Sequence, residues 1–312
     1  MKTVERIVSI LRFFSRNLRA HGNIFGLRED TIPMGTLSKL NMPSSCSIFF
    51  SLDTLLSAWK QVLVAKMAKE RILPNQEILS RLIRNSEVTG RALDVLGDYQ
   101  SIIRNMSNVA KKLGVTGTMI YPRSTGIELY VFGLEDIFYS AAEGLASSIS
   151  ESGAEEIVVY SPIEHLALSM VDSKYRLGVK LTPFLRILSD NISRVRIAIP
   201  RGTAFQESCI HSRWLGIKDY AEGLFDERVG LIRHPLSGTL TTCCGEHIWI
   251  CDPEVAVRNA AERLISLSHV GRGNVCVACP SALYLFRAAI ELYPDDLKDV
   301  KLFELSSLVE VS

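Results

Sequence analysis

The sequence lacks an excess of charge of either sign. Its 35 lysines and arginines are matched by 34 aspartates and glutamates, so the formal net charge is +1. A dedicated nucleic-acid binder presents a strongly positive surface to phosphate groups, and a chain this close to neutrality has no such field overall. The charge balance therefore argues against nucleic acid as a partner.

Long apolar runs are also missing. No uncharged apolar stretch reaches the length of a membrane span, and the first residues do not read as a secretory signal. Seven cysteines in 312 residues are few for a secreted protein held by disulfides. With 47% hydrophobic and 22% charged residues, the sequence predicts a cytoplasmic globular protein that can bury a sizeable core.

The few cysteines are unevenly placed, because six of the seven lie between Cys209 and Cys279. Cys209 is followed after thirty-three residues by a Cys-Cys-Gly motif at 243–245, and Cys276 and Cys279-Pro280 close the stretch. Adjacent cysteines rarely serve a core, since neighbouring side chains on a strand point to opposite faces. A glycine after them lets the backbone take positive φ and bend round a ligand.

Cys279 stands between an apolar run, 275–278, and a helix-like stretch, 281–292. This is a strand-to-helix turn, where open α/β sheets commonly bind ligands. Soft thiolates that converge from three turns suit zinc or an iron–sulfur cluster. A disulfide framework is the alternative, and the lack of a secretory signal disfavours it.

The order and spacing of these motifs resemble the cysteine-rich CCG domain found in heterodisulfide reductases, in the iron–sulfur subunits of glycolate oxidases and in related lactate-utilisation and anaerobic dehydrogenase proteins. The family pattern is Cys, a long gap, Cys-Cys-Gly, a second gap of similar length, and Cys-Pro-x-Cys. In those proteins the domain occurs twice, and at least one copy can hold an unusual iron–sulfur cluster. The compound pattern is far more specific than a lone CxxC.

The resemblance implies four cluster ligands when Cys279-Pro280 is matched to the family's Cys-Pro: Cys209, Cys243, Cys244 and Cys279. The family's last ligand then falls on Ala282, and Cys276 is a candidate substitute. Taking Cys276 and Cys279 as the closing pair instead puts the proline out of register. Four thiolates suffice for a [4Fe-4S] cluster, so the missing fifth puts the non-cubane form in doubt rather than metal binding.

The same pattern continues into the N-terminal half without its cysteines. Ser51-Leu52 stand in place of the first cysteine motif, Ser124-Thr125-Gly126 in place of Cys-Cys-Gly, and residues 161–164, Ser-Pro-Ile-Glu, in place of Cys-Pro-x-Cys. Thirty-five residues separate Thr125 from Ser161, which matches the family's gap. Serine, threonine and glutamate cannot replace thiolates, so this half is expected to hold no cluster. Cys46 lies too early to be a ligand.

The expected fold is α/β, with two tandem, similar CCG-type halves of short strands covered by helices. Residues 1–39 form an N-terminal helix and linker, 40–190 a degenerate half without cysteine ligands, and 191–312 the half that carries the cysteine site. Residues 75–112 predict one or two helices broken near Gly90 and Gly97. A further helix is expected over 253–268, with Asp252 as its cap.

Residues 1–20 repeat apolar side chains at helical spacing, with basic residues at the other positions. The pattern predicts an amphipathic helix that covers a core or a partner subunit. The alternative is peripheral membrane contact, with the basic face on anionic lipid. In relatives, a linker similar to residues 21–27 connects a ferredoxin domain to the CCG halves, and the ferredoxin's cysteine run is absent here.

Several polar residues near these turns have two interpretations. Glu164 and His165 are interpreted as solvated residues at a helix start, and acid–base work or binding of a substrate or hard metal is the alternative. His211 and Arg213 either donate to a cluster at Cys209 or face water. His247 and Cys251 are candidate backup ligands, although Cys251 is rather expected to be buried.

The resemblance implies an iron–sulfur electron-transfer subunit of a heterodisulfide-reductase-like or flavin-linked oxidoreductase, with a flavin- or ferredoxin-bearing redox subunit as its partner. Because one half is degenerate, the two-cluster disulfide reaction is not expected to occur in the same way. The alternative from another class is a non-catalytic assembly subunit whose cysteines hold structural zinc. A thiol–disulfide switch ranks last, because adjacent cysteines make a strained disulfide.

Overall fold

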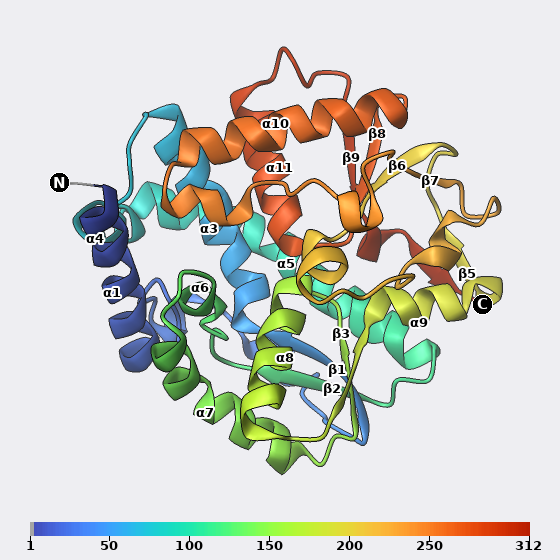
Figure 1. The fold of residues 1–312 in the computed structure, drawn as a ribbon, viewed down its shortest axis with the longest axis horizontal. Helices are drawn as coiled ribbons and strands as arrows, with labels where there is room; N and C mark the ends of the chain where they lie inside the picture. The colour runs from blue at the N-terminus through green and yellow to red at the C-terminus, as the bar shows by residue number, and fades with distance from the viewer. Residues whose placement is uncertain (1–2) are drawn as a thin grey trace.

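The computed structural model describes residues 3–312 and, within them, the side chains of all residues except 35 and 36. Two four-stranded sheets, in the orders β2-β1-β3-β4 and β7-β6-β8-β9, form the framework (Figure 1). The strands of the first sheet are β1 (Cys46–Ser51), β2 (Gly117–Tyr121), β3 (Glu156–Val159) and β4 (Lys180–Pro183). Those of the second are β6 (Thr203–Gln206), β7 (Leu231–Arg233), β8 (Asn274–Val277) and β9 (Lys301–Glu304).

The two sheets repeat one topology. In each, the strand that comes second in the chain pairs with the first, the first with the third, and the third with the fourth, and every pairing is parallel. Strands β1–β4 lie within residues 40–190 and β6–β9 within 191–312. The predicted α/β fold of two similar halves is confirmed. A separate antiparallel pair, β5 (Val195–Ile197) with β10 (Val309–Val311), lies outside both sheets.

Helices cover the sheets on both faces, which explains why the central strands read as continuous apolar runs. Ile48, Phe49 and Phe50 of β1 are fully buried, as are Val275 and Val277 of β8. The helices are α1 (Thr3–His21), α2 (Gly35–Ser38), α3 (Leu52–Lys69), α4 (Gln76–Ile83), α5 (Ser86–Lys112), α6 (Ile127–Val131), α7 (Glu135–Ser152), α8 (Pro162–Tyr175), α9 (Phe184–Asp190), α10 (Pro253–Val270) and α11 (Pro280–Leu292). Short 3-10 or π turns are η1 (Glu29–Thr31), η2 (Ile192–Arg194), η3 (Ile210–Trp214), η4 (Glu222–Phe225), η5 (Gly238–Leu240), η6 (Glu246–Ile250) and η7 (Leu305–Ser307).

Helix α3 joins the two halves. It follows β1 directly and packs against α5 of its own half and against α10 and α11 of the other. Figure 1 shows α3, α5 and α11 passing through the middle of the molecule. Almost every residue of α3 is buried, so its sequence shows little amphipathic contrast.

The helical prediction for 75–112 is right about two helices and wrong about where they break. The interruption falls at residues 84–85, where the side chain of Asn85 accepts a hydrogen bond of 3.1 Å from the N–H of Val88 and so begins α5. Helix α5 runs unbroken through Gly90 and Gly97, which are exposed and have no neighbouring atoms within reach of a Cβ. A solvent-facing glycine weakens a long helix by only about 1 kcal/mol and does not end it.

The predicted helix over 253–268 is confirmed as α10. The Asp252 carboxylate caps it by accepting a hydrogen bond of 3.1 Å from the N–H of Val255, and Pro253 takes the first helical position.

The N-terminal helix α1 uses its apolar stripe within this chain. Phe14 and Leu18 are buried in the core, and the Phe14 ring lies 6.2 Å from that of Trp249. The buried guanidinium of Arg6 donates to the backbone carbonyls of Pro74 and Cys251. The predicted amphipathic helix is therefore present and covers a core. Within residues 3–312, no helix combines the length and the apolar character that crossing a bilayer requires.

Candidate metal centre

Four cysteines from three loops line one cavity. Cys209 comes just after β6, Cys243 and Cys244 lie in the loop after β7, and Cys279 follows β8. Because these strands are parallel, the three loops leave the same edge of the sheet. The cavity has a volume of about 150 Å³ and is bordered by all four residues. The set chosen from sequence spacing is thus brought together in space.

The sulfur of Cys243 is the centre of this group. It accepts hydrogen bonds from the thiols of Cys209 and Cys244, and one of 3.3 Å from the N–H of Gly245. These donors hold the pKa of Cys243 well below its usual range, and the same contacts together with burial raise the pKa of Cys209 and of Cys244. Cys243 is thus the acceptor of the group, and the other two thiols are its donors. A metal would displace the thiol protons, because its ligands must be deprotonated.

Cys279 occupies the N-cap position of α11, with Pro280 at the first helical position. Burial raises the pKa of Cys279 to about 11, against the opposing effect of hydrogen bonds from the N–H groups of Ala282 and Ser281. Ala282, where the resemblance puts the last family ligand, borders the cavity with a methyl group. The chain thus supplies four sulfur atoms to the cavity.

The other three cysteines lie elsewhere. Cys276 is fully buried within β8 and is not among the residues that line the cavity. Cys251 is partly buried beside Arg6. Cys46 begins β1, at the opposite end of its sheet from the loops that follow the strands. Only four of the five cofactor-binding candidates therefore meet.

Two polar side chains flank the sulfur atoms. Arg213 and His247 both line the cavity, and Arg213 is otherwise exposed. The Nδ1 atom of His247 lies 2.7 Å from the Oε2 atom of Glu246. Although burial opposes it, the charge of Glu246 raises the pKa of His247. The site therefore offers an imidazole and a guanidinium beside the four cysteine thiols.

Hydrogen bonds hold the cysteine loops against each other. Gln206, the last residue of β6, donates from Nε2 to the carbonyl of Thr242, and its Oε1 accepts from Arg263 at 2.7 Å. Glu207 accepts a hydrogen bond of 2.6 Å from the N–H of Gly238. The loops that carry Cys209 and Cys243 are tied together just before each cysteine.

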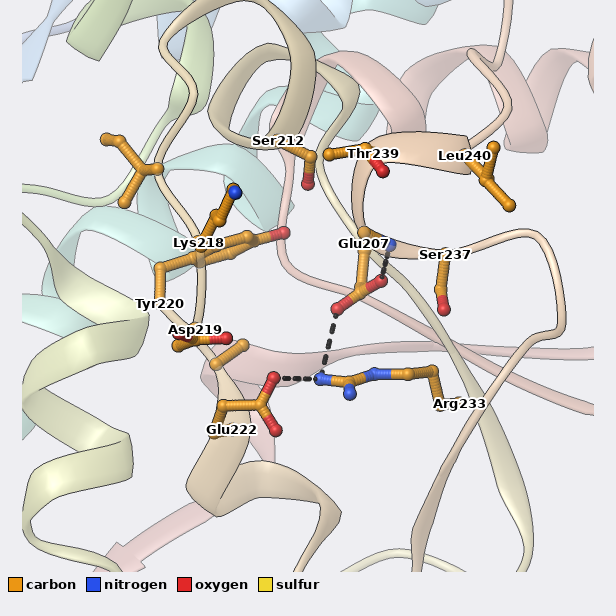
Figure 2. Close-up of a pocket in the computed structure, with 13 residues that line it drawn as sticks. Glu207, Ser212, Lys218, Asp219, Tyr220, Glu222, Arg233, Ser237, Thr239 and Leu240 are labelled. Carbon is orange, nitrogen blue, oxygen red and sulfur yellow. Dashed lines mark hydrogen bonds and ion pairs between the residues drawn. The ribbon is translucent and has the colours of Figure 1, made fainter.

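Glu207 also borders a second, more open pocket of about 410 Å³ on the outer side of these loops. Figure 2 shows Arg233 reaching between Glu222 and Glu207, with nitrogen–oxygen distances of 2.6 and 3.5 Å. The Arg233 guanidinium also lies over the ring of Phe225. Two carboxylates therefore match the charge of Arg233. Through Glu207, which directly precedes the Ser208-Cys209 segment, Arg233 helps to fix the position of the cysteine loops.

A buried ion network connects the cysteine site to the other half. The Nζ atom of Lys60, on α3, lies 2.7 Å from Glu128 Oε1 and 3.2 Å from Glu246 Oε1. Although burial opposes it, these carboxylates raise the pKa of Lys60. Sequence reasoning missed this network. The available signal was a lysine within the apolar run of 52–68, where a charge needs a partner.

The turns of the first half reproduce those of the second. Gly126 and Gly245 both have left-handed backbones, with φ of +75° and +98°, and each precedes a short helix. Ser161, like Cys279, is an N-cap followed by a proline at the first helical position. The predicted correspondence of these turns therefore holds in backbone geometry.

Glu164 and His165 are not solvated, so that interpretation of them is wrong. Their exposed fractions are 0% and 2%, because the loops of both halves close over the start of α8. His165 Nδ1 lies 3.1 Å from His211 Nε2, and burial lowers the pKa of His165 to about 4. His211 is therefore buried against the first half rather than facing water.

Glu164 belongs to a polar group at the first-half turns. Its Oε1 atom accepts hydrogen bonds from the N–H and the hydroxyl of Ser51 and from the hydroxyl of Thr54. The Asp53 Oδ2 atom accepts from the N–H and the hydroxyl of Thr125, at 2.8 and 2.5 Å. Burial raises the pKa of Glu164 to about 8 and also raises that of Asp53. Oxygen-bearing side chains thus lie at the turns that correspond to the cysteine turns of the second half, and Glu164 matches Ala282, which has no sulfur.

Comparison with known proteins adds no assignment: no family model matches the chain, and no curated protein or solved structure matches it. Across residues 3–312, no group of three or more His, Cys, Asp or Glu side chains has an arrangement that could hold a metal ion. The functional argument therefore depends on the cysteine spacing, the repeated turns and the cavity.

Proposed function

We propose that the second half binds an iron–sulfur cluster through Cys209, Cys243, Cys244 and Cys279. The protein then serves as an electron-transfer subunit of a heterodisulfide-reductase-like or flavin-linked oxidoreductase. The observation that carries this proposal is the convergence of four thiols, spread over a long stretch of sequence, on one cavity at the carboxyl ends of parallel strands. A bound cluster would supply reversible one-electron transfer.

The donor set suits a cluster. Four thiolates are the ligands of a [4Fe-4S] cluster, in which each iron takes its own sulfur ligand. A single zinc ion takes four thiolates as well, so the two metals share this donor set and the metal analysis below separates them. Ala282 adds no ligand, which favours the [4Fe-4S] form over a non-cubane one.

The chain also offers hydrogen bonds to the sulfur atoms. The N–H of Gly245 donates to Cys243, and the N–H groups of Ser281 and Ala282 donate to Cys279. Donors of this kind stabilise negative charge on sulfur and so tune the reduction potential of a cluster. Arg213 and His247 add positive potential at the same edge of the cavity.

The surface beside the cavity suits a redox partner. Trp214 lines the cavity and has an exposed fraction of 51%, and Leu240, at the neighbouring pocket, has one of 67%. Large exposed apolar side chains commonly mark contact surfaces. A flavin- or ferredoxin-bearing subunit docked here would exchange electrons over the shortest path. We further propose a cytoplasmic location and no nucleic-acid partner, as the sequence predicts.

Single serine replacements test the ligand assignment. Cys209→Ser, Cys243→Ser, Cys244→Ser and Cys279→Ser should each lower the metal content of anaerobically purified protein, because serine is a poor ligand for soft metals. Cys46→Ser and Cys276→Ser are matched controls that should retain full metal content. The measurement is iron, sulfide and zinc per chain.

Two outcomes would contradict the proposal. Full metal content in the Cys243→Ser and Cys244→Ser variants would show that these two residues are not ligands. One zinc and no iron in the wild-type protein, lost in the same four variants, would instead support the structural zinc alternative.

A further inference from the structure

The first half carries a second polar centre at the position that the cysteine site has in the second half. Ser51 is the last residue of β1, Asp53 lies in the first turn of α3, Thr125 follows β2, and Glu164 follows β3 across the Ser161-Pro162 turn. All of these side chains are buried. Since the strand order and both turn geometries repeat, this oxygen-rich group corresponds to the sulfur-rich one.

Each carboxylate in this group has one well-partnered oxygen and one with no partner. Glu164 Oε1 and Asp53 Oδ2 accept all the hydrogen bonds that the neighbouring hydroxyl and N–H groups donate. Glu164 Oε2 and Asp53 Oδ1 are buried and accept none. The exposed fractions of the two residues are 0% and 5%, so bulk water does not serve these atoms. Buried oxygens without a partner are rare and call for an explanation.

The two carboxylates face a common region. The hydroxyl of Ser51 lies 2.6 Å from Glu164 Oε1 and 3.3 Å from Asp53 Oδ2, so one small side chain contacts both acids. The hydroxyl of Ser124, at the same turn as Thr125, is also buried without a partner. Residues that follow the first three strands, two acids and a serine, therefore each carry a buried oxygen without a partner, and Ser51 joins the two acids.

The charges of the surrounding network do not balance. Four buried carboxylates, on Asp53, Glu128, Glu164 and Glu246, are accompanied by two basic groups, Lys60 and His247. With all six groups ionised, an excess of two negative charges would be left inside the protein, and the raised pKa values of Asp53 and Glu164 mean that protons compete with a cation for these two acids. Buried charge without compensation is strongly unfavourable, so the network calls for added positive charge.

We propose that the first half binds one hard divalent cation, of the Mg²⁺ or Mn²⁺ type, between Asp53 Oδ1 and Glu164 Oε2. Such cations take oxygen ligands and are commonly held by one or two carboxylates with further oxygens or water. A divalent ion balances the two excess charges and gives both unpartnered oxygens a partner. The described residues contain no group of three or more His, Cys, Asp or Glu side chains that could hold a metal ion. The proposed centre has only two such side chains, so it is smaller than the groups to which that absence applies. The inference does not depend on the iron–sulfur proposal, since no cysteine takes part.

Binding of Mn²⁺ to the purified full-length protein tests this proposal. After treatment with EDTA and its removal, Mn²⁺ is added and the free ion is followed by electron paramagnetic resonance. We expect one Mn²⁺ bound per chain, displaced by Mg²⁺, together with a Mn²⁺-dependent rise in Tm. Asp53→Asn and Glu164→Gln should each weaken binding at least tenfold.

The matched control is Glu155→Gln, which removes the same charge from an exposed position just before β3, at the opposite end of that strand. It should bind Mn²⁺ as the wild type does. Absence of a bound ion and of a Tm shift in the wild type overturns the proposal, and this result needs no variant. Equal weakening by Glu155→Gln overturns it as well. In that case protons would neutralise the buried acids. Replacing Glu164 by Gln would then increase the free energy of unfolding more at pH 8 than at pH 5.

Discussion

At the scale of single residues, the two halves share backbone geometry and differ in chemistry. Gly126 and Gly245 hold the same left-handed turn, while the residues before them are Ser-Thr in one half and Cys-Cys in the other. The left-handed turn favours glycine, whereas the side chains before it set which chemical groups the turn presents. Oxygen suits hard cations and sulfur suits soft metals, so under our two proposals a few substitutions adapt one scaffold to different metals.

Gly126→Ala should destabilise the protein. A Cβ there would lie 2.5 Å from Leu18 Cδ2, and a positive φ costs a non-glycine residue about 1–2 kcal/mol even without a clash. Gly90→Ala is the contrasting change, because Gly90 lies on the exposed face of α5 and a Cβ meets no atom there. It should stabilise by up to about 1 kcal/mol. Urea unfolding measures both, and shifts of the same sign would contradict this account.

Residue identity limited what the sequence could predict. The ligand set could be chosen because cysteine is rare here and its spacing is distinctive. Glu164 could not be placed, since a glutamate after a proline at a helix start is usually solvated and favoured by the helix dipole. Its burial depends on loops from both halves, which no local pattern reveals.

At the scale of elements, α3 couples the halves through a charge rather than through apolar contacts alone. Lys60 reaches Glu128 at the first-half turn and Glu246 next to the cysteine pair. A buried pair of this kind contributes little net stability, yet removing one partner leaves the other charge unpaired. Lys60 is therefore expected to matter for how the two halves fit together.

Lys60→Met should lower the free energy of unfolding by about 3–5 kcal/mol, because it leaves Glu128 and Glu246 buried without their cation. Lys66→Met, on the same helix, is the matched control. Lys66 pairs with Glu70 at the surface, and such solvent-screened pairs contribute little to stability. Urea unfolding compares the two variants. Equal effects would show that the buried network has no special role.

The elements themselves were predictable to different degrees. Asp252 followed by Pro253 indicated the start of α10 correctly, because caps act locally. The break between α4 and α5 was misplaced, since exposed glycines in α5 looked like breakers and the true cap, Asn85, was overlooked. A capping residue, whose side chain bonds a specific backbone N–H, predicted a helix boundary more reliably than the mere presence of glycine.

At the scale of the whole molecule, duplication is the organising feature. The strand order, the direction of pairing and two turns recur in both halves. Gap lengths predicted this repeat because they are set by the lengths of strands and helices, which outlast residue identity. The contacts between the halves, such as His165 with His211, could not be predicted from either half alone.

The central claim, that the second half holds an iron–sulfur cluster, is tested most directly by chemical analysis of protein purified without oxygen. Iron, acid-labile sulfide and zinc are measured together with the visible spectrum before and after dithionite. We expect about four irons and four sulfides per chain and an absorbance that bleaches on reduction, as a [4Fe-4S] cluster requires. Colourless protein with one zinc, or with no metal at all, would contradict the claim.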